Sequence, residues 1–143
     1  MAYPLTATLD GQVELLGYDL STATPGASGA SVAPGETLTL TLYWRALAEM
    51  EESYTVFTHL VGPDGTLSGQ QDNPPVGGTY PTNLWLAGEV VADVYGVEVG
   101  TDAAPGAHRL EVGMYVAETG MRLPVDGTDE DAVVLQTVVV MEP

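Results

Sequence analysis

The sequence predicts an all-β fold: an antiparallel two-sheet sandwich of the immunoglobulin or fibronectin-III type with about seven strands, for which a jelly roll is the alternative. Segments of alternating apolar and polar residues recur along the chain, turn signals separate them, and no stretch has a convincing helical period. The 143 residues include 17 glycines and 10 prolines, and 45% are hydrophobic. This composition suits one β-rich domain spanning residues 1–143, with its core over residues 12–140.

The first half of the chain contains the clearest strand. In residues 36–44, leucines at every second position share one face with Trp44, opposite threonines and a tyrosine. Trp44 is therefore predicted to lie in the core. Residues 12–20 form an earlier strand with apolar side chains on one side, and residues 23–31, which are rich in small side chains, are expected to form a loop.

The middle of the chain predicts two strands joined by a turn. Residues 54–61 are apolar on both faces over much of their length, which fits a strand in the middle of the sandwich. The sequence Gly-Pro-Asp-Gly at residues 62–65 follows, and here proline sets φ while glycine supplies the positive φ of a tight turn. A short strand over residues 67–71 completes the pair.

Three further strands are expected in the second half. Residues 90–99 and 133–140 are apolar on both faces, so both are predicted to be covered on two sides, whereas residues 109–116 alternate. Arg109 faces away from the apolar side of its strand. We expect it to pair with a carboxylate on a neighbouring strand, such as Asp93.

The charge balance excludes several classes of partner. The chain has 20 acidic residues and only three basic ones, all arginines, so its formal net charge is −17. Nucleic acids and anionic membrane surfaces both need clustered cations, and neither is an expected partner. No apolar run approaches the ~18 residues of a membrane span, so direct membrane insertion is not expected. There is no cysteine, which removes disulfides and thiolate metal sites. The oligomeric state stays open.

Polar and aromatic residues gather around the one long segment without strand character, residues 72–87. A long loop on a rigid sandwich is where binding residues often lie. Aromatic rings stack on sugars, and carboxylate and amide groups pair with sugar hydroxyls, so carbohydrate is the preferred ligand. The alternative is that Trp85 closes the end of the sandwich while Asp72 and Thr82 bond to loop backbone. The candidate ligand-binding residues are His59, Gln71, Asp72, Asn73, Tyr80, Thr82 and Trp85.

His59 is the best single candidate for chemistry. A carboxylate from Asp72 or Asp93 would form a histidine–carboxylate pair with a shifted pKa. No GxSxG motif and no cysteine nucleophile accompanies the histidine. We therefore expect no enzymatic activity and no catalytic residue, and a structural hydrogen bond from His59 to Asp72, Thr82 or a backbone carbonyl.

An acidic segment near the C-terminus offers oxygen ligands of the kind calcium prefers. If calcium binds, the expected ligands are Asp126, Asp129 and Asp131. The segment is shorter than an EF-hand loop and lacks its closing glutamate, so a solvated acidic loop is the alternative. No other cofactor is expected.

The order of motifs along the chain resembles that of a β-sandwich domain of uncharacterised function in Chloroflexi-type bacteria. In those proteins the domain follows the membrane region of a mannosyltransferase-like glycosyltransferase. The resemblance spans roughly residues 13–140. The motifs that carry it are LLGYDL, PGETLTLTLYW, YTVFTHL, the GPDG turn, QQDNPP, PTNLW and GMYVAETGMRLPV.

The resemblance implies a location and a role. It implies a non-catalytic module of an exported or membrane-anchored protein, extracellular or on the outer face of the cell membrane, and no signal peptide is visible in this chain. Its expected partner is a carbohydrate or a neighbouring protein domain. A structural or protein-interaction spacer without a small-molecule ligand is the alternative. The activity of the membrane enzyme does not carry over, because the domain lacks catalytic residues.

Overall fold

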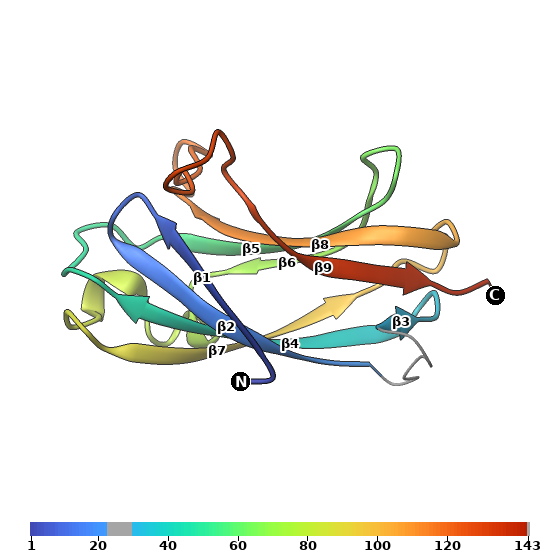
Figure 1. The fold of residues 1–143 in the computed structure, drawn as a ribbon, viewed down its shortest axis with the longest axis horizontal. Coiled ribbons are helices and arrows are strands. Elements are labelled where there is room, and N and C mark those ends of the chain that lie inside the picture. The colour runs from blue at the N-terminus through green and yellow to red at the C-terminus, as the bar shows by residue number, and fades with distance from the viewer. Residues whose placement is uncertain (23–29, 143) are drawn as a thin grey trace.

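Two stacked β-sheets make up the protein, whose computed structural model describes residues 1–22 and 30–142 (Figure 1). Within those residues, the first sheet has the order β1 (Tyr3–Leu9), β2 (Val13–Ser21), β4 (Thr37–Ala46) and β7 (Val90–Glu98). The second has the order β3 (Ser31–Val32), β9 (Val133–Val140), β8 (Gly106–Tyr115), β5 (Thr55–Val61) and β6 (Leu67–Asn73). All neighbours are antiparallel except β3 and β9. The all-β, two-sheet prediction is confirmed, and the immunoglobulin-like subtype stays a prediction.

The core lies between the sheets and follows the period of two. In β4 the alternate leucines and Trp44 are fully buried, as predicted. From the opposite sheet, Val56 and Leu60 of β5 and Leu110 of β8 are also fully buried. Because neighbouring residues of a strand point to opposite faces, Phe57 and His59 of β5 must lie on the outer face of the second sheet.

Two strands were not predicted, and two were predicted in the wrong environment. β1 contains Pro4 and a register shift after it, and β3 has two residues, so neither shows a clear alternation. The predictions that β7 and β9 are covered on both sides were wrong. In β9 the outward side chains face solvent, and Val134 is 54% exposed. β7 is an edge strand in which buried and exposed residues alternate, and Val94 is 59% exposed. The loop predicted over residues 23–31 lies outside the described residues except at its last two positions.

Two long connections leave the sheets. The connection between β6 and β7 carries two 3₁₀ turns, η1 (Val76–Gly78) and η2 (Thr82–Leu84), and lies at one end of the sandwich. The connection between β8 and β9, residues 116–132, rises above the outer face of the second sheet (Figure 1). None of the described helices is long and apolar enough to cross a bilayer.

Candidate functional site

A cluster of polar and aromatic side chains lies on the outer face of the second sheet. Phe57 and His59 project there from β5, because their neighbours in the strand fill the core. The β5–β6 register pairs Phe57 with Asp72 and His59 with Gln70. β8 pairs with β5 on the other side and brings Tyr115 to the same face.

Phe57 forms an apolar base for this cluster. It is only 1% exposed although it lies outside the main core, because the guanidinium of Arg122 stands over its ring at 4.1 Å from the centroid. The rings of His59 and Tyr115 flank it, with centroids 4.9 and 6.3 Å away. Beneath it lies Gly113, where an added Cβ would meet the ring at 2.5 Å. Glycine at this position lets the ring rest on the sheet.

Arg122 reaches the cluster because the β8–β9 connection folds back on β8. An isolated bridge pairs Arg122 with Tyr115, and the amide of Leu123 donates to the carbonyl of Met114 at 2.9 Å. The guanidinium also pairs with Asp131 at 3.2 Å. The connection therefore forms one wall of the site and supplies a guanidinium to its lining.

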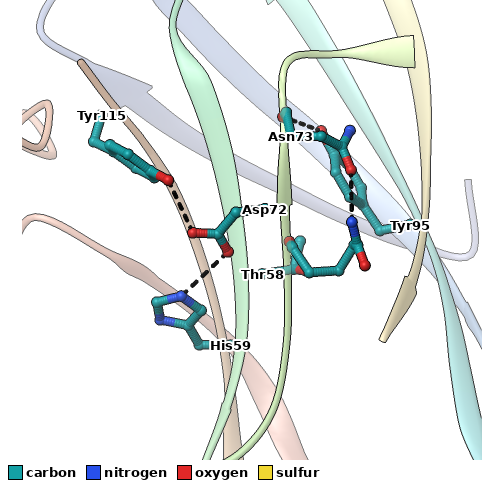
Figure 2. Close-up of polar contacts among 7 residues, drawn as sticks. Thr58, His59, Asp72, Asn73, Tyr95 and Tyr115 are labelled. Carbon is teal, nitrogen blue, oxygen red and sulfur yellow. Dashed lines mark hydrogen bonds and ion pairs between the residues drawn. The ribbon is translucent and has the colours of Figure 1, made fainter. Parts of the chain in front are cut away.

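Asp72 lies at the centre of the polar groups. Its Oδ2 accepts a hydrogen bond from the Tyr115 hydroxyl at 3.1 Å, and its Oδ1 lies 3.3 Å from Nε2 of His59 (Figure 2). The predicted histidine–carboxylate pair is therefore present. Both atoms of that second contact are buried and have no hydrogen-bond partner of good geometry. These two atoms therefore face each other away from solvent, whereas the His59 and Asp72 side chains as a whole remain 12% and 20% exposed.

The protonation states follow from burial. Burial lowers the pKa of His59, Asp72 acts in the opposite direction, and Arg122 lowers the pKa further. The imidazole is therefore neutral at pH 7. Burial, followed by the hydrogen bond to Asp72, raises the pKa of Tyr115, so its hydroxyl stays a donor. Near neutral pH the cluster offers a carboxylate, a neutral imidazole, a phenol and a guanidinium.

These groups surround a hollow of about 220 Å³. This volume is smaller than the ~300–1,000 Å³ of sites for drug-sized ligands. A hollow of this size suits one sugar ring or the end of a glycan chain. The lining residues are Phe57, His59, Gln70, Asp72, Tyr115, Gly120 and Arg122.

Two of the predicted binding residues, Trp85 and Tyr80, form hydrogen bonds within the β6–β7 connection. The Trp85 side chain is 1% exposed, and its Nε1 donates to the Tyr80 carbonyl at 2.9 Å. The Tyr80 hydroxyl donates to the Glu89 carboxylate at 2.7 Å. The two rings therefore form no exposed stacking surface beside Asp72, and Trp85 fills the end of the sandwich, which was the alternative interpretation.

Thr82 is also structural. Its hydroxyl is fully buried, accepts from the amide of Tyr54 at 2.9 Å and donates to the carbonyl of Glu52 at 2.6 Å. It therefore fastens the β6–β7 connection to the β4–β5 connection. The sequence placed Thr82 among the candidate binding residues, with a bond to its own loop as the alternative, and the structure gives it bonds to a different connection.

Gln71 lies in β6, as predicted, and Asn73 also belongs to β6 and not to the predicted loop. They alternate with Asp72 along the strand and so project to its other side. The Gln71 amide donates to Asn73 Oδ1 at 3.0 Å, and the Asn73 amide donates to the Pro74 carbonyl at 2.8 Å. The structure therefore brings together His59 and Asp72 of the predicted set and separates the others from them.

The predicted calcium ligands do not converge. Asp126 accepts from the amide of Gly11 at 3.0 Å, while Asp131 pairs with Arg122. Over residues 1–22 and 30–142, no group of three or more His, Cys, Asp or Glu side chains is placed to hold a metal. The structure therefore does not assemble a site from Asp126, Asp129 and Asp131.

The expected pairing of Arg109 with Asp93 was wrong. Arg109 Nε bonds to Glu111 of its own strand at 2.9 Å. Asp93 lies in β7 of the other sheet, where it is fully buried.

Sequence reasoning missed Phe57, Gln70, Tyr115 and Arg122. Phe57 and Gln70 could have been predicted, because a hairpin over the GPDG turn places β5 and β6 side by side and aligns their outer faces. Tyr115 and Arg122 depend on strand order and on the path of the β8–β9 connection, for which the sequence carries no local signal.

Comparison with known proteins supports the fold. No protein-family model and no curated protein matches the sequence. Among solved structures, the C-terminal domain of Wzt is similar, with a TM-score of 0.64 and 12% identity over 98% of this chain and 80% of that one. At this identity the likeness establishes a shared β-sandwich fold. The resemblance to domains of mannosyltransferase-like proteins stays a prediction.

Proposed function

We propose that this protein is a non-catalytic carbohydrate-binding module whose site is the hollow around His59, Asp72 and Tyr115. The observation that carries the proposal is the small hollow that combines a partly exposed His59–Asp72 pair with aromatic walls. A sugar hydroxyl is both donor and acceptor, so it matches a carboxylate next to a neutral imidazole. The ring of Tyr115 adds apolar surface for the sugar's C–H groups.

The same lining argues for binding without catalysis. Most glycosidases need two carboxyl groups on either side of the scissile bond. The residues that line this hollow include one carboxylate, Asp72, which is already engaged by Tyr115. The hollow is also shallow and open on the outer face of a sheet.

The proposed location is the outer face of the cell, within an exported or membrane-anchored protein. This part of the proposal is supported only by the resemblance of the motif order described above. Detection of the full-length protein in surface-labelled or protease-treated intact cells tests it, and protection from both reagents would contradict it.

A glycan-array screen followed by titration calorimetry tests the binding proposal. We expect wild-type binding, and at least tenfold weaker binding of Asp72→Asn and Tyr115→Phe, each of which removes one polar feature while keeping shape. Asp129→Asn is the matched control, because it makes the same charge change on the exposed acidic loop. Thermal melting establishes that all variants fold. Absence of wild-type binding, or full binding by both site variants, would overturn the proposal.

A further inference from the structure

A second surface lies at the end of the sandwich, where the β4–β5 connection meets the segment that leads into β7 (Figure 1). We call it the end surface. It encloses a hollow of about 480 Å³, more than twice the volume of the proposed sugar site. Its lining residues are Glu49, Met50, Glu51, Asn83, Leu84, Trp85 and Leu86.

The end surface is held in place by its own hydrogen bonds. Thr82 joins the two connections through the contacts described above. The Glu89 carboxylate accepts from the amide of Leu86 at 2.9 Å, and the amide of Gly88 donates to the carbonyl of Ala46 at 2.7 Å. A partner would therefore meet a surface that is already ordered, which lowers the entropic cost of binding.

Two large apolar side chains are exposed on this surface. Leu84 is 56% exposed and Leu86 is 63% exposed, while Met50 and Trp85 form a buried base beneath them. Adjacent exposed apolar side chains rimmed by polar residues can mark a protein interaction site, and here they lie beside a hollow.

The charges at the rim determine what kind of side chain fits. Glu49 and Glu51 are exposed at the hollow, and its lining contains no basic residue. Arg45, in β4 just before this connection, lies beside Glu14 at 3.7 Å. An arginine or lysine from a partner would lay its aliphatic stem on Leu84 and Leu86 and place its cation between the glutamates.

We propose that the end surface binds a segment of another protein in which arginine or lysine stands next to large apolar residues. The inference is independent of the proposed sugar site, which lies on the outer face of the second sheet. A second copy of this chain is the poorer occupant, because the net charge of −17 repels and a symmetric contact would bring glutamate against glutamate. The partner's basic residues supply the complement that this chain lacks.

A defined peptide probe tests the proposal. The probe is an acetylated and amidated 12-residue peptide of alternating arginine and leucine carrying a fluorophore, and a glutamate–leucine peptide of the same length is its negative control. Fluorescence anisotropy is measured at about physiological ionic strength, where long-range attraction is largely screened. We expect saturable 1:1 binding of the arginine peptide and none of the glutamate peptide.

Matched variants separate this surface from the overall negative charge. The variant Leu84→Ser/Leu86→Ser keeps every charge, and we expect it to weaken binding at least fivefold. Glu49→Gln/Glu51→Gln should do the same, whereas Glu118→Gln/Asp129→Asn, with the same charge change on the β8–β9 connection, should leave binding unchanged. Thermal melting checks that each variant is folded.

Several outcomes would overturn the inference. No binding of the arginine peptide would do so, as would equal weakening by both pairs of charge variants, which would mean attraction to net charge alone. Binding that survives the leucine substitutions would also contradict it. Sedimentation velocity should show a monomer, and a dimer that dissociates in Leu84→Ser/Leu86→Ser would mean that a second copy occupies the surface instead.

Discussion

Replacement of Asp93 is the sharpest test of how β7 holds the β6–β7 connection. The carboxylate is fully buried and accepts three hydrogen bonds: from the amide of Val76 at 2.8 Å, the Tyr95 hydroxyl at 2.6 Å and Nε1 of Trp44 at 3.3 Å. Val76 has φ of 57°, which is strained for a β-branched residue. The bond from its amide to Asp93 helps to hold this strained turn after β6.

Asp93→Ala removes the acceptor and keeps the donors. Nε1 of Trp44 would be left as an unsatisfied buried donor, at roughly 1–3 kcal/mol, and the partly buried amide of Val76 would lose one hydrogen bond, at roughly 0.5–1.5 kcal/mol. The Tyr95 hydroxyl already lies 3.4 Å from the Asn73 carbonyl and can turn to it. We expect a loss of about 3 kcal/mol in the free energy of unfolding, which for a domain of this size lowers Tm by roughly 10 °C.

Urea unfolding followed by the fluorescence of the two buried tryptophans, Trp44 and Trp85, measures this loss. Asp93→Asn keeps one carbonyl oxygen but turns an amide toward a donor, so it should cost about 1–2 kcal/mol, less than the alanine variant. A cost below about 1 kcal/mol for Asp93→Ala, or a larger cost for the asparagine variant, would refute the hydrogen-bond argument.

The pH dependence gives an independent check. Burial raises the pKa of Asp93, and the three hydrogen bonds oppose that rise only in part. The folded state therefore binds this proton more tightly than the unfolded chain, whose aspartate pKa is about 3.9. As the pH falls through the raised pKa toward that value, the wild type should gain stability relative to Asp93→Asn. A relative loss over the same window would mean that hydrogen bonding outweighs burial.

Two further predictions concern the candidate site. Gly113→Ala should cost about 1–3 kcal/mol in urea unfolding, because its Cβ would meet the Phe57 ring at 2.5 Å and displace it toward Arg122; unchanged stability would contradict the packing described here. His59 should titrate by NMR below its ordinary pKa of about 6.5, and lower still in Asp72→Asn. Because the unfolded chain then binds the proton more tightly, the contribution of His59 to stability should fall as the pH drops through 6.5, and a midpoint above that value would be inconsistent with its burial.

The fold was predictable where a strand's own residues reveal its environment. β4 is the clear case, because its alternate leucines and Trp44 can only face a core. β7 shows the limit of this reasoning. Its outward valines resemble those of a covered strand, but coverage depends on the order of strands in the sheet, and β7 is at an edge. Edge position is a tertiary property, and periodicity does not encode it.

The candidate site was predictable only as far as one hairpin extends. The pair of His59 and Asp72 follows from two strands joined by a short turn, because register then brings their outward residues together. Tyr115 and Arg122 complete the site but lie far from the hairpin in sequence, since Tyr115 is 43 residues from Asp72. Their positions depend on how the β8–β9 connection packs against Phe57, which no local pattern specifies.

The β6–β7 connection shows why its most chemically distinctive residues are poor candidates for binding. Trp85 and Thr82 are the residues whose groups can best satisfy buried backbone, and the structure uses them for that purpose. Trp85 is buried, and the leucines on either side of it, Leu84 and Leu86, are exposed. The side chains of this connection that a partner could contact are therefore the two leucines. Trp85→Ala would remove both the base of the hollow at the end surface and the packing of the connection, so it does not separate binding from stability, whereas the leucine substitutions test this surface in a folded protein. The two proposed surfaces can then be separated: Asp72→Asn should leave peptide binding intact, and Leu84→Ser/Leu86→Ser should leave glycan binding intact. Loss of both activities in either variant would mean that one of these substitutions acts through the fold and not at a surface.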